Sequence, residues 1–121
     1  MNNVTVKTTD WQMTDELSAC LDEKIAAIEK LLRDPESETV RCNVELSAIR
    51  DQHATRFRAE MTLTENGRLY RAEARGGTMR DALDQLKEGI QQQLRKSKQK
   101  HVSFLRRGGL VLKRWSRFGR E

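Results

Sequence analysis

The chain has few of the residues that build metal and disulfide sites. It holds only two cysteines and two histidines among 121 residues. Cys20 and Cys42 lie far apart with no CxxC pattern, and neither His53 nor His101 has a Cys, His or Asp at ligand spacing. We therefore expect no metal site and no disulfide, and we expect both cysteines to be small core residues.

Long apolar stretches are also absent. No segment approaches the roughly 18 apolar residues of a membrane-spanning helix, and the first residues lack the apolar run of a signal peptide. The sequence shows no nucleophile paired with a base, no paired carboxylates at a recognisable spacing and no phosphate-binding loop. We expect a cytoplasmic protein that has no membrane span, needs no cofactor and is not an enzyme.

What the chain does have is positive charge gathered at one end. Its length suits a single domain, and 23 Lys/Arg against 18 Asp/Glu give a net charge of +5. Residues 95–121 hold ten of these cations and one acid, which leaves 13 cations and 17 acids for residues 1–94. A basic end on a mildly acidic body indicates a polyanionic partner, either nucleic acid or an anionic membrane surface.

The first part of the chain predicts a strand followed by a helix. Residues 3–9 alternate and are rich in β-branched residues, as in a strand. Thr14 then suits a helix N-cap, with acids in the first turn where they favour the helix dipole. We expect the helix to end by Asp34, because Pro35 disfavours helical geometry in the residue before it. Apolar residues at gaps of three and four form one stripe on this helix: Leu17, Cys20, Leu21, Ile25, Ile28, Leu31 and Leu32.

Three more strands are predicted in a meander. Residues 39–49 and 55–65 alternate between apolar and polar positions. Asn66-Gly67 then predicts a two-residue hairpin, because a type I′ turn needs positive φ at both central residues. Such a loop places inward residues opposite inward residues, so the turn and the pattern agree on the register. The predicted pairs are Leu63 with Tyr70, Met61 with Ala72, and Ala59 with Ala74, and Gly76-Gly77 ends the last strand.

A second helix is predicted from Thr78 to about Lys100. Its apolar stripe comprises Met79, Ala82, Leu83, Leu86, Ile90 and Leu94. We expect residues 1–101 to form an α+β domain of order β-α-β-β-β-α, a four-stranded sheet with two helices packed on one face. Residues 102–121 are expected to be a flexible basic tail, with a short amphipathic turn near Leu110 to Trp115.

The cations at the end of the second helix form the main candidate site. Four of them fall within residues 93–101 without an acid. One or two would suffice to favour the helix dipole at a solvated helix end, so four indicate a surface that binds a polyanion. The candidates are Arg95, Lys96, Lys98 and Lys100, together with Lys24, Lys30, Arg80 and Lys87 on the two helices, and with Arg106, Arg107, Lys113, Arg114 and Trp115 as tail contacts.

The outward face of the predicted sheet carries charges of both signs. Its arginines and glutamates alternate along the strands, so cross-strand ion pairs and contacts with RNA both remain open for them. The arginines in question are Arg56, Arg58, Arg71 and Arg75.

The order and spacing of these features resemble a known family, the short ribosome hibernation-promoting factors of the ribosome-associated inhibitor type. The resemblance covers about residues 2–101 and rests on TDEL and LDEKIAAIEKLL in the first helix, the meander, and TMRDALDQLKEGIQQQLRKSKQKH after a Gly-rich strand end. Gly89 and Gln92 stand where that family is usually basic. The residues that match its pattern are Lys24, Asp84, Gln93, Leu94, Lys96, Lys98 and Lys100.

The resemblance implies a protein that binds the small ribosomal subunit between head and body. Cations of both helices would contact 16S-type rRNA, and the folded body would compete with mRNA and tRNA for their channel. Translation would then be silenced by steric occlusion during stress or stationary phase, with no cofactor, and we expect a monomer away from the ribosome.

Two other functions remain open from the sequence. The first is a general double-stranded RNA-binding module, since a three-stranded sheet followed by a basic helix resembles that class, although its domains begin with a helix and not with a strand. The second is a peripheral membrane or partner-docking protein that acts through residues 102–121. Binding to any RNA duplex, or loss of function on removal of the tail, would distinguish these from a ribosome-bound factor.

Overall fold

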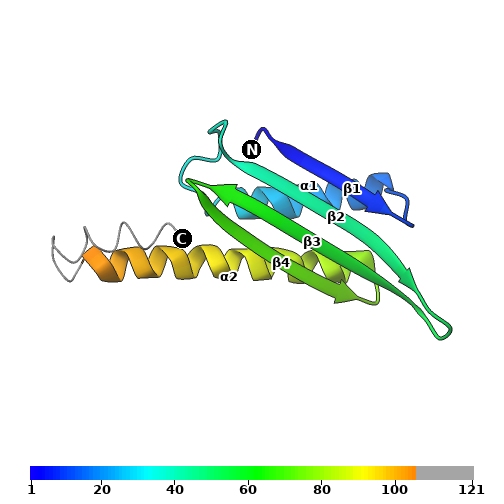
Figure 1. Ribbon diagram of the computed structural model, residues 1–121. Coiled ribbons are helices and arrows are strands. Elements are labelled where there is room, and N and C mark those ends of the chain that lie inside the picture. Colours follow the sequence, from blue (N-terminus) through cyan, green and yellow to red (C-terminus); the bar gives the residue numbers. More distant parts are fainter. Residues whose placement is uncertain (106–121) are drawn as a thin grey trace.

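The protein forms a four-stranded sheet with both helices on the same side (Figure 1). The computed structural model describes the backbone of residues 1–105 and the side chains of residues 1–98. The order β-α-β-β-β-α and the α+β class predicted from the sequence are confirmed. The elements are β1 (Val4–Thr9), α1 (Asp15–Glu29), β2 (Arg41–Arg50), β3 (Thr55–Glu65), β4 (Arg68–Gly76) and α2 (Met79–Leu105).

The strands lie in the sheet in their sequence order. β1 pairs with β2 in parallel, and α1 connects the two, which makes the first three elements a β-α-β unit. β2, β3 and β4 then pair antiparallel. The edges of the sheet are therefore β1 on one side and β4 on the other.

The β3–β4 hairpin has the predicted turn and register. Asn66 has a φ of 51° and Gly67 a φ of 75°, as a type I′ turn requires. The predicted pairs of Leu63 with Tyr70, Met61 with Ala72, and Ala59 with Ala74 are all present.

The core lies between the sheet and the two helices. Every second residue of β2 and β3 is buried there, together with the stripes of α1 and α2. Both cysteines are buried free thiols, as expected. Burial, aided by the negative charge of Glu29, raises the pKa of the Cys42 thiol to about 11. The largest fully buried side chains are Ile28, Val40, Val44, Leu46, Met61, Leu63, Leu83, Leu86 and Ile90.

Helix α1 begins as predicted but ends earlier. Thr14 is the N-cap, and its side chain accepts a hydrogen bond from the N–H of Leu17. The prediction that Leu31 and Leu32 belong to the helix is wrong, because α1 ends at Glu29. Their N–H groups bond to carbonyls three residues back, at 3.0 and 3.1 Å, so the chain tightens into a turn. Leu32 is still buried in the core.

Helix α2 begins at its predicted cap and continues beyond its predicted end. The Thr78 hydroxyl accepts the N–H of Asp81 at 3.1 Å. The helix runs to Leu105, so the expectation that it stops near Lys100 is corrected, and residues 102–105 are helical. The expected flexible tail beyond them and its amphipathic turn lie outside the described residues.

Candidate nucleic-acid interface

Helices α1 and α2 lie side by side and run in the same direction. Residues later in α1 contact residues later in α2, from the first turn of each helix to the end of α1. Their C-terminal ends therefore lie at the same end of the molecule, and α2 continues past α1 there (Figure 1). The contacting pairs are Glu16 with Arg80, Lys24 with Asp84, and Ala27 with Gln91.

Two of the predicted binding lysines share one carboxylate between the helices. Lys24 Nζ lies 3.2 Å and Lys87 Nζ 3.6 Å from the same oxygen of Asp84. The hydrogen bond from Lys24, followed by the charges of both lysines, lowers the pKa of Asp84. The two lysine side chains are only 17% and 20% exposed, so their stems cover the line where the helices meet.

The sequence did not assign Asp84 this role. Asp84 lies three residues before Lys87 on the same helix, and this spacing indicates the ion pair between the two. The ion pair of Asp84 with Lys24 joins residues 60 positions apart, and only the packing of α1 against α2 brings Lys24 to Asp84.

The other two predicted cations on the helices are more exposed. Arg80 pairs with Glu16 at 2.6 Å, and both side chains are largely in solvent, where an ion pair contributes little. Lys30 is the C-cap of α1 and is exposed, with no ion pair among the described residues.

The end of α2 presents three cations together. Arg95, Lys96 and Lys98 are exposed, and no carboxylate among the described residues pairs with them. The side chain of Lys100 lies outside the described residues. The same holds for the candidate tail residues Arg106, Arg107, Lys113, Arg114 and Trp115. The described part of the site is therefore the solvent face of two parallel helices, with its highest cation density where α2 extends past the end of α1.

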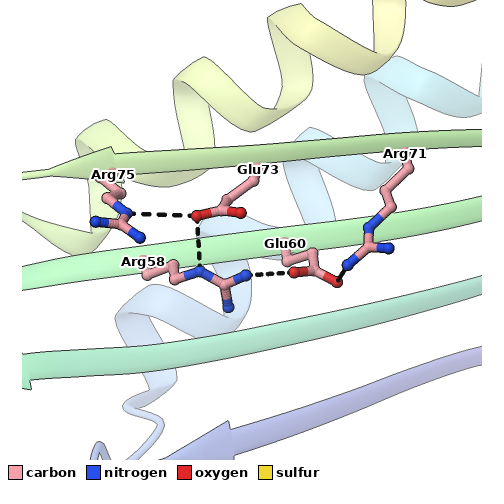
Figure 2. Close-up of polar contacts among 5 residues, drawn as sticks. All are labelled: Arg58, Glu60, Arg71, Glu73 and Arg75. Atoms are coloured by element: carbon pink, nitrogen blue, oxygen red, sulfur yellow. Dashed lines mark hydrogen bonds and ion pairs between the residues drawn. The ribbon is translucent and has the colours of Figure 1, made fainter.

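The outer face of the sheet has a different electrostatic character. Figure 2 shows five side chains of β3 and β4 in one continuous chain of ion pairs. Glu73 accepts from Arg58 at 2.8 Å and from Arg75 at 3.3 Å, and Glu60 accepts from Arg71 at 2.8 Å and also from Arg58. The hydrogen bond with Glu73 raises the pKa of Arg58, and the same bond lowers the pKa of Glu73.

Cross-strand pairing, one of the two alternatives for the sheet arginines, is thus what the structure shows for Arg58 and Arg71. Arg75 pairs with Glu73 of its own strand. Arg58, Arg71 and Arg75 are held by glutamates, whereas Arg56 is exposed without an ion pair among the described residues. The register places Glu60 opposite Glu73, so the arginines also separate like charges that would otherwise repel.

Other kinds of site find no support in the described part of the chain. It contains no group of three or more His, Cys, Asp or Glu that could hold a metal ion. Neither of its helices combines the length and the apolar character that a membrane span needs.

Comparisons with known proteins identify the family. Among solved structures, the chain is similar to the Protein Y N-terminal domain of Thermus thermophilus, with a TM-score of 0.61 and 17% identity over 79% of this chain and 98% of that one. It is also similar to a ribosomal subunit interface protein of Coxiella burnetii, with a TM-score of 0.59 and 14% identity over 79% and 97%. A search of curated proteins gave no match. Residues 4–102 match the profile of the Sigma 54 modulation protein / S30EA ribosomal protein family. The resemblance to hibernation-promoting factors is thereby confirmed, and the chain belongs to this ribosome-associated family.

Proposed function

We propose that the protein binds the small ribosomal subunit in the channel of mRNA and tRNA and silences translation by occupying it. The observation that carries this proposal is the group of three exposed cations at the end of α2, on a chain of a ribosome-associated family. Arg95, Lys96 and Lys98 can reach phosphates from a helix that the rest of the fold holds in place. Folded RNA is recognised mainly through its shape and its phosphates, which suits a rigid body with cations at one end.

The remaining predicted cations extend the same surface toward the start of the helices. Lys24 and Lys87 already share Asp84, so an RNA phosphate must compete with that carboxylate for them. Lys30 has no such competitor among the described residues and lies at the C-terminal end of α1. We therefore expect the end of the helix pair to contribute more to binding than its middle. Lys100 and the basic residues beyond Leu105 would extend the surface further.

The proposed mechanism is steric and needs no chemistry from the protein. A folded body in the channel excludes mRNA and the tRNAs of the aminoacyl and peptidyl sites. Because the protein and tRNA would fill the same part of the channel, a small subunit should hold one or the other but not both. The protein would act in the cytoplasm as a monomer that exchanges with ribosomes under stress.

Co-sedimentation across a salt series tests this proposal against general RNA binding. The purified protein is mixed with whole ribosomes, with separated subunits, and with an RNA duplex at equal nucleotide concentration. Binding to small subunits and whole ribosomes that persists at salt concentrations where the duplex no longer binds supports the proposal. Equal binding to the duplex and the subunit would show a general double-stranded RNA-binding module instead. If the protein sediments instead with anionic lipid vesicles added to a parallel sample, and only while residues 102–121 are present, the tail-docking function is favoured.

A further inference from the structure

Strand β4 is an edge of the sheet, and part of its open side is closed by a side chain. In an antiparallel pair, every second residue directs its N–H and C=O away from the neighbouring strand. Arg71 is such a residue, and within residues 1–105 no strand lies beyond β4 to bond with it. Unpaired edges of this kind invite pairing with another chain, so proteins cover or interrupt them.

The amide of Gln93 makes both of the hydrogen bonds that a further strand would make at Arg71. Gln93 Oε1 accepts the N–H of Arg71 at 3.3 Å, and Gln93 Nε2 donates to the C=O of Arg71 at 2.6 Å. A carboxamide suits this position because it carries a donor and an acceptor on separate atoms, whereas a carboxylate lacks the donor and an ammonium lacks the acceptor. Helix α2 is thereby bonded to the backbone of β4 and not only packed against it.

Gln93 belongs to a line of three residues that follows β4. Gly89, Gln93 and Ser97 are four positions apart, which places them on one face of the helix; we call this line the β4 seam. At its start, a Cβ on Gly89 would lie 3.3 Å from the Cβ of Ala72, so the glycine lets the helix come close to the strand. At its end, Ser97 Oγ accepts a hydrogen bond from Tyr70 Oη at 3.2 Å and another from the Arg68 guanidinium.

The neighbouring Gln91 makes a corresponding bond on the side of α1. Its Nε2 donates to the carbonyl of Ala27 at 3.3 Å. That carbonyl would normally receive the N–H of Leu31, which bonds to Ile28 instead where α1 tightens at its end. Between the two anchoring glutamines, Gln92 is exposed and makes no side-chain hydrogen bond among the described residues.

We propose that Gln93, with Gly89 and Ser97, is a positioning residue that holds the cation-bearing end of α2 in place for phosphate binding. The seam lies next to Arg95, Lys96 and Lys98 and anchors the helix where it leaves the support of α1. A helix end without such anchors frays, and a frayed end holds fewer of its cations in place against phosphates. This inference rests on the proposed function, because it assigns the seam a role in that same interface.

The first test needs no RNA and compares Gln93→Ala with Gln92→Ala. Both variants remove the same side chain from neighbouring helix positions, and neither changes the charge. NMR amide exchange of Arg71 reports the bond directly, with Leu69 and Glu73 on the same open edge as internal references. The proposal predicts that Arg71 exchanges about tenfold faster in Gln93→Ala, since a lost hydrogen bond is worth about that factor, and at the wild-type rate in Gln92→Ala. Equal rates at Arg71 in all three proteins would overturn it.

The second test measures binding to small subunits as a function of salt. With fewer cations held in place, Gln93→Ala should bind more weakly than wild type. The slope of its log K against log salt should be smaller in magnitude by about 0.9, which is the contribution of one phosphate contact. Gln92→Ala should match the wild type. A shallower slope cannot arise from a loss of stability that leaves the charge unchanged. A weaker Gln93→Ala with an unaltered slope, or an identical loss in Gln92→Ala, contradicts the proposal. Wild-type protein that does not bind small subunits would refute the proposed function, while Arg71 exchange would still show whether Gln93 anchors the helix.

Discussion

Neutralising the three cations at the end of α2 is the most informative perturbation of the proposed interface. Arg95, Lys96 and Lys98 are exposed and have no carboxylate partner among the described residues. Replacing all three by glutamine keeps a residue of similar helix propensity at each position, so the helix should persist. The change therefore removes charge from the site with little effect on the fold, and the free energy of unfolding should stay close to that of the wild type.

The size of the effect follows from the number of phosphate contacts that these side chains can make. Each contact with a duplex contributes about 0.9 to the slope of log K against log salt, so three contacts contribute about 2.7. Between 50 and 200 mM salt, the wild type should then lose about 40-fold more affinity than the variant. Fluorescence anisotropy of labelled protein with purified small subunits measures both slopes.

A control variant with the same loss of charge elsewhere distinguishes a binding site at the helix end from general attraction between a basic protein and RNA. Arg41, Arg50 and Arg56 on β2 and β3 are also exposed, so their replacement by glutamine removes the same charge from the sheet. This control should keep the wild-type slope. If the two triple variants lose slope equally, the binding surface is not localised to the helix end. If the helix variant keeps the full wild-type slope, its cations make no phosphate contacts and the assignment of the site is wrong.

Three further predictions concern the fold and its charged groups. Gly67→Ala should lower the free energy of unfolding by about 1–2 kcal/mol in urea, because its φ of 75° is unfavourable for a residue with a Cβ; an unchanged value contradicts the turn. Asp84→Asn should destabilise the protein at neutral pH, because the lowered pKa of Asp84, due first to Lys24 and then to Lys87, means that the folded state favours the carboxylate. That contribution is present above the ordinary carboxyl pKa and is lost as the pH falls through the lowered one, so urea curves of variant and wild type should converge in acid; a constant difference would refute it. The Cys42 thiol, with its pKa raised to about 11, should react with a thiol reagent at pH 8 only after unfolding, and rapid labelling of the native protein would contradict its burial.

The features that the sequence predicts well depend on local patterns. Alternation along three strands and the Asn66-Gly67 dipeptide are enough for the register of the hairpin, because the turn allows only one pairing that keeps the apolar residues on one face. Thr14 and Thr78 mark the starts of both helices, since a cap acts through groups three residues away.

The features that it missed depend on contacts between distant segments. The end of α1 is one example, because apolar spacing continues through Leu32 although the helix stops at Glu29. Gly89 is another, since in the sequence it is a helix-weakening residue in a usually basic position, whereas in the fold it faces Ala72. The contact of Gln93 with the edge of β4 likewise follows only from the packing of the helix on the strand.

The candidate site shows the same division. The density of cations near residue 95 is visible in the sequence, and three of them are exposed together in the structure. Which other cations are already engaged could not be predicted, because Lys24 meets Asp84, and Arg58 meets Glu73, only through tertiary packing and strand pairing. Charge counting locates a basic region but does not identify the partners of its members.

Displacement from the small subunit tests the central claim most directly. Labelled protein is bound to small subunits, and tRNA with mRNA, or an equal amount of RNA duplex, is then added at constant ionic strength. Steric occlusion predicts that tRNA and mRNA together release the protein in a saturable manner, whereas the duplex releases little. A complex that holds the factor, tRNA and mRNA at the same time would show that the protein does not occupy their channel, and the proposed mechanism would be wrong.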